Sequence, residues 1–320
     1  MDFQPALLSR IQIFPVKSLQ GLSLAECQIG HHSLLHDRRF AMFTANGQYM
    51  IGKRSGRVNQ LEVRFNLEKD LITLRPREDG AIEQGASGRR IQTIESEDAR
   101  PQFSAGLRDA PADIGPDPGR GEETFHFKDD RASLERYLSI FFGESITLRE
   151  DTAGGQMDLP LMRSATLVSS ASLESLAPDL GVTAPDDLRQ RFRFNLEVEG
   201  WTAFAEESLI GQSRGTRIQV GDVEMVAVVP CKRCSVPSRD LETGRIDPNF
   251  VKSMVESRKL SLPPDSPIPE FGSLYYLTIG LFIPASETGK SIRCGDPIRA
   301  GESVRLRFSP GGEVIGYDRW

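Results

Sequence analysis

Short β-strand patterns, each followed by a turn signal, recur along this sequence and constrain its fold more than any other feature. Between residues 61 and 67, apolar side chains alternate with polar or charged ones, which predicts a strand with one buried face. Lys69 and Asp70 then turn the chain into a second apolar run at Leu71–Leu74. Many short strands with few helices predict a β-barrel or a mixed α+β core.

A second hairpin is predicted around Asn46-Gly47, because this dipeptide is the strongest short hairpin signal. Its flanking segments, Arg39–Ala45 and Gln48–Ile51, have strand composition. Leu8–Ile13 is a further strand pattern and ends before Pro15. We expect the strands of the first half to pair as one antiparallel sheet.

Strands and a few short helices are also predicted beyond residue 125. The first expected helix begins after Asp130, which can cap it, and ends before Gly143. Two further short helices are expected at Ser172–Leu176 and Asn249–Arg258. Residues 188–196 form a basic stretch. Residues 235–272 are rich in proline and serine, so this second segment is expected to be mostly loop. The expected strands are Ala165–Ser169, Ile218–Val220, Val223–Val229, Leu274–Ile283 and, as the last one, Val304–Phe308.

The middle of the first half changes character. Residues 76–123 are rich in Gly, Pro, Asp and Arg and show little periodicity, so we expect a long loop excursion with one strand near residues 91–94. The segment separates the early strands from the helix pattern that leads to residue 150. We therefore predict two domains, residues 1–150 and 151–320.

Composition excludes several classes of protein. The chain has 38% hydrophobic and 26% charged residues, which is typical of a globular protein. No apolar run approaches the ~20 residues that cross a bilayer, and the N-terminus lacks the features of a secretory signal. A net charge of −6 gives no support for nucleic-acid binding. We expect a cytoplasmic protein with no membrane or nucleic-acid partner and without structural disulfides.

A Cys-x-x-Cys motif at Cys231 and Cys234 is the sharpest local feature. It follows an apolar strand pattern that ends at Pro230, and Lys232 and Arg233 lie between the two cysteines. Neighbouring cations favour the thiolate, which is a soft metal ligand. The spacing alone leaves three alternatives open: a redox pair, part of a zinc site, or two cysteines without a chemical role.

Four histidine and aspartate side chains near residue 34 form a second candidate cluster. His31, His32, His36 and Asp37 are residue types that bind metals, and two of the histidines have helical spacing. The surrounding sequence is typical of a loop that leads into a strand. We expect surface histidines here and no metal site.

Several motifs in a fixed order resemble one known family. The chain resembles the MOSC family, in which an N-terminal β-barrel domain precedes the MOSC domain, and the order is similar to that of amidoxime-reducing components and hydroxylaminopurine reductases. The motifs are Phe14-Pro15-Val16-Lys17-Ser18, Asp37-Arg38-Arg39-Phe40, Arg191-Phe192-Arg193-Phe194-Asn195, Cys231-Lys232-Arg233-Cys234 and Leu241-Glu242-Thr243-Gly244. The resemblance implies a β-rich mixed α+β fold, with an N-terminal antiparallel β-barrel-like domain and a MOSC β-barrel with short helices.

The resemblance also implies a cofactor and its site. Members of the family bind a molybdenum-pyranopterin cofactor, and the second cysteine of the motif, here Cys234, is the metal ligand and the catalytic residue. Cys231 is left outside the metal's ligands. A pterin phosphate is anionic, which suits guanidinium, ammonium and hydroxyl donors. The cofactor-binding positions that the resemblance implies are Lys17, Ser18, Arg38, Lys53, Ser169, Ser170, Arg193 and Asn195.

The activity implied by the resemblance is a two-electron reduction. The molybdenum accepts an oxygen atom from a small N-hydroxylated substrate, and a separate iron–sulfur or flavin protein supplies the electrons. Two other classes remain open. Cys234 could carry a persulfide in a molybdenum-cofactor carrier or sulfur-transfer protein, or the basic residues could form an anion-binding module without catalysis.

Overall fold

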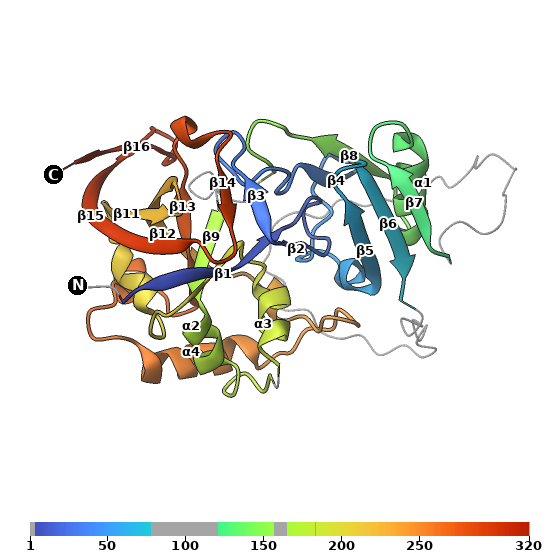
Figure 1. Cartoon of the computed structure of the whole chain (residues 1–320). Coiled ribbons are helices and arrows are strands. Elements are labelled where there is room, and N and C mark those ends of the chain that lie inside the picture. Colours follow the sequence, from blue (N-terminus) through green and yellow to red (C-terminus); the bar gives the residue numbers. More distant parts are fainter. Residues whose placement is uncertain (1–3, 78–120, 157–164, 183, 320) are drawn as a thin grey trace, which may run out of the picture.

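A closed barrel of seven strands is the centre of the molecule (Figure 1). The computed structural model describes residues 4–77, 121–156, 165–182 and 184–319. Strand β15 pairs with β1 and thereby closes the barrel. Strands β9 and β10 pair with each other in parallel. Around the barrel the strands are β15 (Pro297–Phe308), β11 (Arg214–Val220), β12 (Val223–Lys232), β13 (Tyr276–Phe282), β9 (Ala165–Ser169), β10 (Leu196–Glu199) and β1 (Ala6–Ile13). Strands β16 (Val314–Arg319) and β2 (Leu22–Leu24) extend the sheet beyond β15 and β1.

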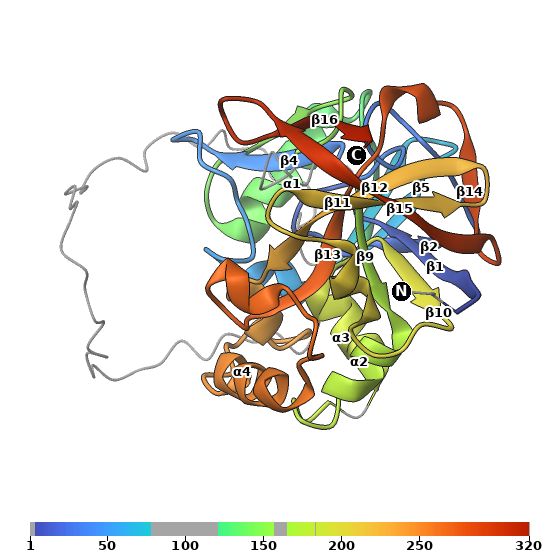
Figure 2. The same ribbon diagram turned by 90° about the vertical axis from the view of Figure 1, so that its left-hand side faces the viewer.

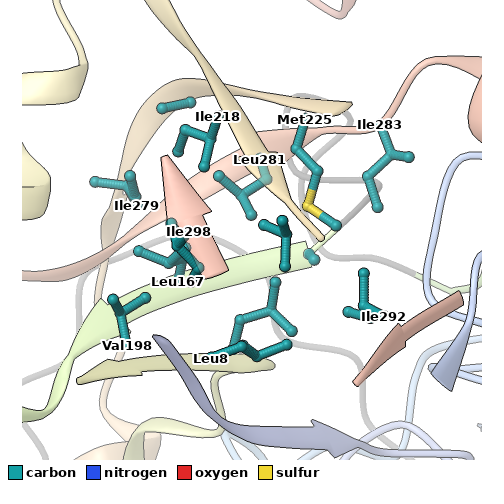
Figure 3. Close-up of a cluster of buried hydrophobic side chains, with 14 of the residues drawn as sticks. Leu8, Leu167, Val198, Ile218, Met225, Ile279, Leu281, Ile283, Ile292 and Ile298 are labelled. Atoms are coloured by element: carbon teal, nitrogen blue, oxygen red, sulfur yellow. The ribbon is translucent and has the colours of Figure 1, made fainter. Parts of the chain in front are cut away.

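Branched aliphatic side chains fill the interior of the barrel (Figure 3). Leu8 of β1, Leu167 of β9 and Ile218 of β11 point into one buried cluster. Val198 and Leu281 join it from β10 and β13. Because side chains alternate between the two faces of a strand, each strand contributes every second residue to this core.

The remaining part of the first half forms smaller sheets beside the barrel (Figure 1). The sheets comprise β4 (Phe40–Thr44) with β8 (Ile146–Glu150), β5 (Leu61–Asn66) with β6 (Leu71–Pro76) and β7 (Glu123–His126), and β3 (Glu26–Gln28) with β14 (Ser291–Arg293). A separate hydrophobic core lies between helix α1 (Arg131–Phe142) and the sheets formed by β4 to β8, whereas Cys27 of β3 and Ile292 of β14 belong to the barrel core. Because β1 belongs to the barrel, the barrel contains residues from both halves of the chain; the domain division at residue 150 stays a prediction.

Three helices pack together on one side of the barrel (Figures 1 and 2). They are α2 (Ser170–Leu176), α3 (Pro185–Phe192) and α4 (Phe250–Ser261). Short 3₁₀ turns lie at Gly56–Gln60, Ala205–Leu209, Val236–Ser238, Ile268–Phe271 and Ala285–Glu287. The predicted fold class, a β-rich mixed α+β protein with a barrel and short helices, is confirmed. No helix among the described residues has the length and apolar character needed to cross a membrane.

Most local strand predictions are confirmed, but after the Asn46-Gly47 turn residues 48–51 form only an isolated bridge, Phe43 with Tyr49, and some longer-range predictions are wrong. The strands of the first half do not form one sheet, because β1 pairs with β10 and β15 while β4 pairs with β8. These partners are far away in the sequence, and alternation alone does not identify them. Strand β16 follows the strand that was expected to be the last.

Two further expectations need correction. Strand β12 does not end at Pro230 but continues through Cys231 to Lys232, with an irregular register that tolerates a proline. The basic stretch at residues 188–196, for which no helix is predicted, overlaps helix α3, which begins at Pro185 and is followed by Arg193 in a left-handed conformation. The predicted strand near residues 91–94 lies outside the described residues, as does most of the predicted loop excursion.

Helix α1 has the predicted ends, but Asp130 does not cap its N-terminus in the predicted way. Gly143 ends it with a left-handed φ of 74°. The Asp130 carboxylate does not cap the helix; its Oδ2 accepts a hydrogen bond from the His126 backbone N–H at 2.8 Å. The side chain therefore stabilises the turn before the helix.

Candidate functional site

A cleft of about 780 Å³ joins four segments that are distant in the sequence. Its volume is in the range of small-molecule sites. Most of the wall comes from the end of β1 with the loop after it, the loop after β4, the end of α3, and the end of β12 with the following turn. Arg38 before β4, Gln156 and Thr166 complete it. The structure brings together here seven of the predicted site residues, which are Lys17, Ser18, Arg38, Lys53, Arg193, Asn195 and Cys234.

The two cysteines of the motif both line the cleft but differ in environment. Cys231 is 1% exposed, and burial raises the pKa of its thiol to about 11. Cys231 is therefore a neutral thiol at physiological pH. Cys234 lies beyond the end of β12 and is partly exposed, and its carbonyl oxygen accepts a hydrogen bond from Tyr275 Oη at 3.0 Å. Cys234 is the more accessible of the two sulfur atoms.

Lys17 and Ser18 lie on one wall of the cleft. Lys17 is 5% exposed; its Nζ donates to the carbonyl oxygen of Gln156 at 2.8 Å and lies 4.2 Å from the centre of the Tyr49 ring. Ser18 has a left-handed φ of 72°, and its Oγ accepts a hydrogen bond from the Gly52 N–H at 3.4 Å. Such a backbone conformation is uncommon for serine and is often found at binding sites.

Arg38 and Arg193 share one aromatic side chain. Both guanidinium groups lie over the Phe14 ring, at 4.9 and 4.2 Å from its centre. Arg38 Nη2 donates to the Arg193 carbonyl oxygen at 3.2 Å, and Arg193 Nη1 donates to the carbonyl oxygen of Leu19 at 2.6 Å. Both residues have left-handed φ values, 51° and 52°. The two positive charges are thus fixed side by side by stacking and by backbone contacts.

Asn195 lies at the cleft, but its amide is already engaged within the protein. It donates to the Gln12 carbonyl oxygen at 3.0 Å and to Asp37 Oδ2 at 3.1 Å, and its Oδ1 accepts from the Thr166 N–H at 3.1 Å. Asp37 also accepts from the Phe14 N–H at 2.8 Å and pairs with Arg38. Asn195 and Asp37 therefore position the wall that holds Arg38. Sequence reasoning missed this role of Asp37.

Ser169 and Ser170 are placed away from the cleft wall. Ser169 is fully buried, and its Oγ caps α2 by accepting a hydrogen bond from the Ser172 N–H at 3.1 Å. Ser170 Oγ donates to Glu197 Oε1 at 2.9 Å. Glu197 in turn pairs with Arg189, which lines the cleft. The structure thus connects Ser170 to the cleft only through this ion pair.

An arginine that sequence reasoning missed holds the turn after Cys234. Arg239 is 9% exposed and donates to the carbonyl oxygens of Gly52 at 2.6 Å and Gly244 at 2.7 Å. A third bond, at 3.3 Å, reaches the carbonyl oxygen of Lys53. Arg239 therefore fastens the Cys234 turn to the loop that carries Lys53. Only contacts between distant segments reveal this role.

The charge of the cleft is strongly positive, although the whole protein is acidic. Ten lysine and arginine residues line it against one acidic residue, Asp186. Within the described residues, Nε of Arg191 and of Arg233 is buried without a hydrogen-bond partner. The cationic wall residues are Arg10, Lys17, Arg38, Lys53, Arg189, Arg191, Arg193, Lys232, Arg233 and Arg239. This donor set fits an anionic ligand such as a phosphate-bearing pterin.

The protein by itself does not surround a metal ion in the part that is described. No three His, Cys, Asp or Glu side chains there are placed to hold one, and this includes the histidines near residue 34. His32 Nδ1 instead lies 3.2 Å from the carbonyl oxygen of Ile283. A metal at Cys234 would therefore take its other ligands from a cofactor, and a dithiolene-bearing pterin suits this arrangement.

The chain is similar to several characterised proteins. Human molybdenum cofactor sulfurase is 21% identical over 80% of this chain, but the chain spans only 29% of the length of that protein. Bovine mitochondrial amidoxime reducing component 2 is 24% identical over 92% of this chain and 83% of its own length. Mouse mitochondrial amidoxime-reducing component 1 is 23% identical over 92% of this chain and 82% of its own length.

Family models agree with the motifs and with the barrel. The model described as the MOSC N-terminal beta barrel domain matches residues 5–103. The model described as the MOSC domain matches residues 123–299, which include Arg193, Asn195 and Cys234. Since this second match covers more than half of the chain, the protein belongs to the MOSC domain family.

Proposed function

We propose that this protein is a molybdenum-cofactor-dependent oxidoreductase that reduces small N-hydroxylated compounds. The observation that carries the proposal is an accessible cysteine, Cys234, in a cleft whose wall has ten cationic side chains. The similarity to amidoxime reducing components along most of their length supports the same activity class. With an amidoxime, two electrons and two protons convert the N–OH group into N–H and release one water molecule.

The residues of the cleft have separate tasks in this proposal. Cys234 binds the molybdenum through its thiolate, and Lys17, Ser18, Arg38, Lys53 and Arg193 hold the pterin and its phosphate. Asn195 acts indirectly, through Asp37 and Arg38. The bound cofactor supplies the two-electron oxygen-atom chemistry. Ser169 and Ser170 stay predicted cofactor contacts. The hydrogen bond of Ser170 to Glu197, which pairs with Arg189, supports an indirect role for Ser170 more than a direct contact.

Electrons have to come from another molecule in this proposal. The described residues contain no group of cysteines or histidines placed to hold a metal centre. In this proposal a separate iron–sulfur or flavin protein supplies two electrons per turnover. Reduction of the loaded protein by a reduced viologen dye would replace this partner in an assay.

Metal analysis of matched cysteine variants tests the proposal. We expect about one molybdenum and one pterin per chain in the wild type, and loss of molybdenum in Cys234→Ala. Cys294→Ala is the control, because Cys294 is exposed and does not line the cleft. Full molybdenum content in Cys234→Ala contradicts the ligand assignment.

A carrier or sulfur-transfer function is the second candidate, and the similarity to molybdenum cofactor sulfurase favours it. In this case Cys234 would bear a persulfide. Metal-free protein that releases sulfane sulfur, and loses it in Cys234→Ala but not in Cys294→Ala, would favour the carrier over the reductase.

A further inference from the structure

The positive side chains of the cleft differ in how their charge is compensated. Arg38 pairs with Asp37, and Arg189 pairs with Glu197 at 2.6 Å. Arg10 lies 3.6 Å from the Glu197 carboxylate and 3.4 Å from Asp186. These three arginines therefore face carboxylates of the protein itself, and these carboxylates compensate most of their positive charge.

Other cations of the wall have a different kind of partner. Arg239 donates to backbone carbonyl oxygens of three residues, and Arg233 donates to the carbonyl oxygen of Phe192. Carbonyl oxygens satisfy hydrogen bonds but do not neutralise a full charge. The interior of the cleft therefore keeps a positive potential that a cofactor phosphate would partly compensate, since a phosphate monoester brings nearly two negative charges.

Two lysines extend this potential to the mouth of the cleft. Lys53 and Lys232 both line the cleft and are exposed to solvent. Neither forms an ion pair with any residue in the described ranges. Lys232 is the last residue of β12, two positions before Cys234, and the Lys53 loop is fastened to the Cys234 turn by Arg239. Lys53 is one of the proposed pterin contacts, so a bound cofactor would compensate its charge, whereas Lys232 keeps an uncompensated ammonium group on the exposed part of the wall.

We propose that the cleft selects N-hydroxylated substrates that carry a negative charge, with Lys232 attracting the anionic group at the mouth. A carboxylate and a phosphate share the chemistry that this field recognises. Because the walls of a cleft concentrate a field of one sign, the selection acts on encounter and binding and falls as ionic strength rises. This inference rests on the proposed reductase function and specifies its substrate class.

A matched pair of amidoximes tests the selection. Para-carboxybenzamidoxime carries one negative charge, and para-carbamoylbenzamidoxime has nearly the same shape without it. With molybdenum-loaded protein and a reduced viologen dye, we expect kcat/KM for the carboxylate to exceed that of the amide by about fivefold or more at low salt. The difference in kcat/KM between the two compounds should come from KM. The ratio of their kcat/KM values should approach one in about 0.5 M salt, because salt screens the charge.

Variants assign the effect to the mouth of the cleft. Lys232→Ala should lower the ratio of the two kcat/KM values, and Lys232→Arg should preserve it because the charge remains. Lys252→Ala removes a lysine that is exposed on α4 and absent from the cleft wall, so its ratio should equal that of the wild type. A ratio unchanged in Lys232→Ala, or equally lowered in Lys252→Ala, overturns the assignment.

Binding without turnover separates the two proposals. In the absence of an electron donor, calorimetric titration of the loaded protein gives Kd for both compounds. Tighter binding of the carboxylate in this titration, with no reduction of either compound in the separate assay with reduced viologen, refutes the reductase and leaves the anion selectivity standing. Reduction of both compounds with equal Kd and equal kcat/KM refutes the selectivity and leaves the reductase standing.

Discussion

Glu206 shows how one buried side chain sets a pH dependence for the whole fold. Its carboxyl group is 1% exposed; Oε1 accepts a hydrogen bond from Ser172 Oγ at 2.8 Å. Oε2 has no hydrogen-bond partner among the described residues. Burial raises the pKa of this carboxyl to about 7. Since desolvation disfavours the ionised form, the folded protein holds the proton more tightly than the unfolded chain does.

We expect the free energy of unfolding to fall as the pH rises from about 4.5 to about 7, because the unfolded chain releases this proton in that range while the folded state still holds it. The full loss is about 3 kcal/mol and is present above pH 7. About 2 kcal/mol of this loss falls between about pH 5.5 and about pH 8, and Glu206→Gln should remove most of it when urea unfolding is compared at these two pH values. The exposed Glu68, changed to Gln, is the control, and an equal pH response in Glu206→Gln and the wild type would refute the assignment.

At the scale of elements, the turn after β12 depends on one close backbone contact. Gly244 has a left-handed φ of 70°, and a Cβ at this position would lie 2.2 Å from the Gly56 carbonyl oxygen. Asp240 Oδ1 accepts from the Thr243 N–H at 2.7 Å and shapes the same turn. These contacts give a physical reason for the Thr243-Gly244 pair of the motif, because it lets the turn approach the loop that carries Lys53.

We predict that Gly244→Ala destabilises the protein more than Gly289→Ala does. Gly289 also has a left-handed φ, 90°, but its added Cβ would meet nothing within 4 Å, so only backbone strain of about 1–2 kcal/mol is expected there. Gly244→Ala adds a backbone overlap and should also lower the molybdenum content of the purified protein. Urea unfolding and metal analysis measure both effects; equal losses of stability in the two variants would contradict the close contact.

At the scale of the whole molecule, the cleft connects the barrel with the sheets of the first half. Its wall combines Lys17 and Lys53 from the first half with Arg193 and Cys234 from the second. A ligand in this cleft contacts both parts and binds only when they are folded together. Ligand binding therefore stabilises the complete chain by mass action.

Loaded protein should accordingly unfold several degrees above metal-free protein in differential scanning calorimetry. Cys234→Ala purified without molybdenum should match the metal-free wild type. If loaded and metal-free samples unfold at the same temperature, the cofactor is not bound in this cleft.

The sequence by itself determined the features that depend on neighbouring residues. Alternation predicted β5, an apolar run after a turn predicted β6, a glycine predicted the end of α1, and the ordered motifs identified the family and most of the cleft wall. Such signals survive in any surroundings, because strand alternation and glycine conformations are local properties.

Only the tertiary structure decided which distant segments meet. Closure of the barrel pairs Leu7 with Pro297, and the turn after Cys234 is held by Arg239 on carbonyl oxygens of another loop. It also showed that Asn195 is already hydrogen-bonded to Asp37 and that Lys232 lies at the cleft mouth without an ion pair in the described residues. These contacts depend on how complete surfaces pack, and no local pattern encodes them. Cys234 therefore lies in a cleft of cationic side chains only because distant segments of the chain fold around it.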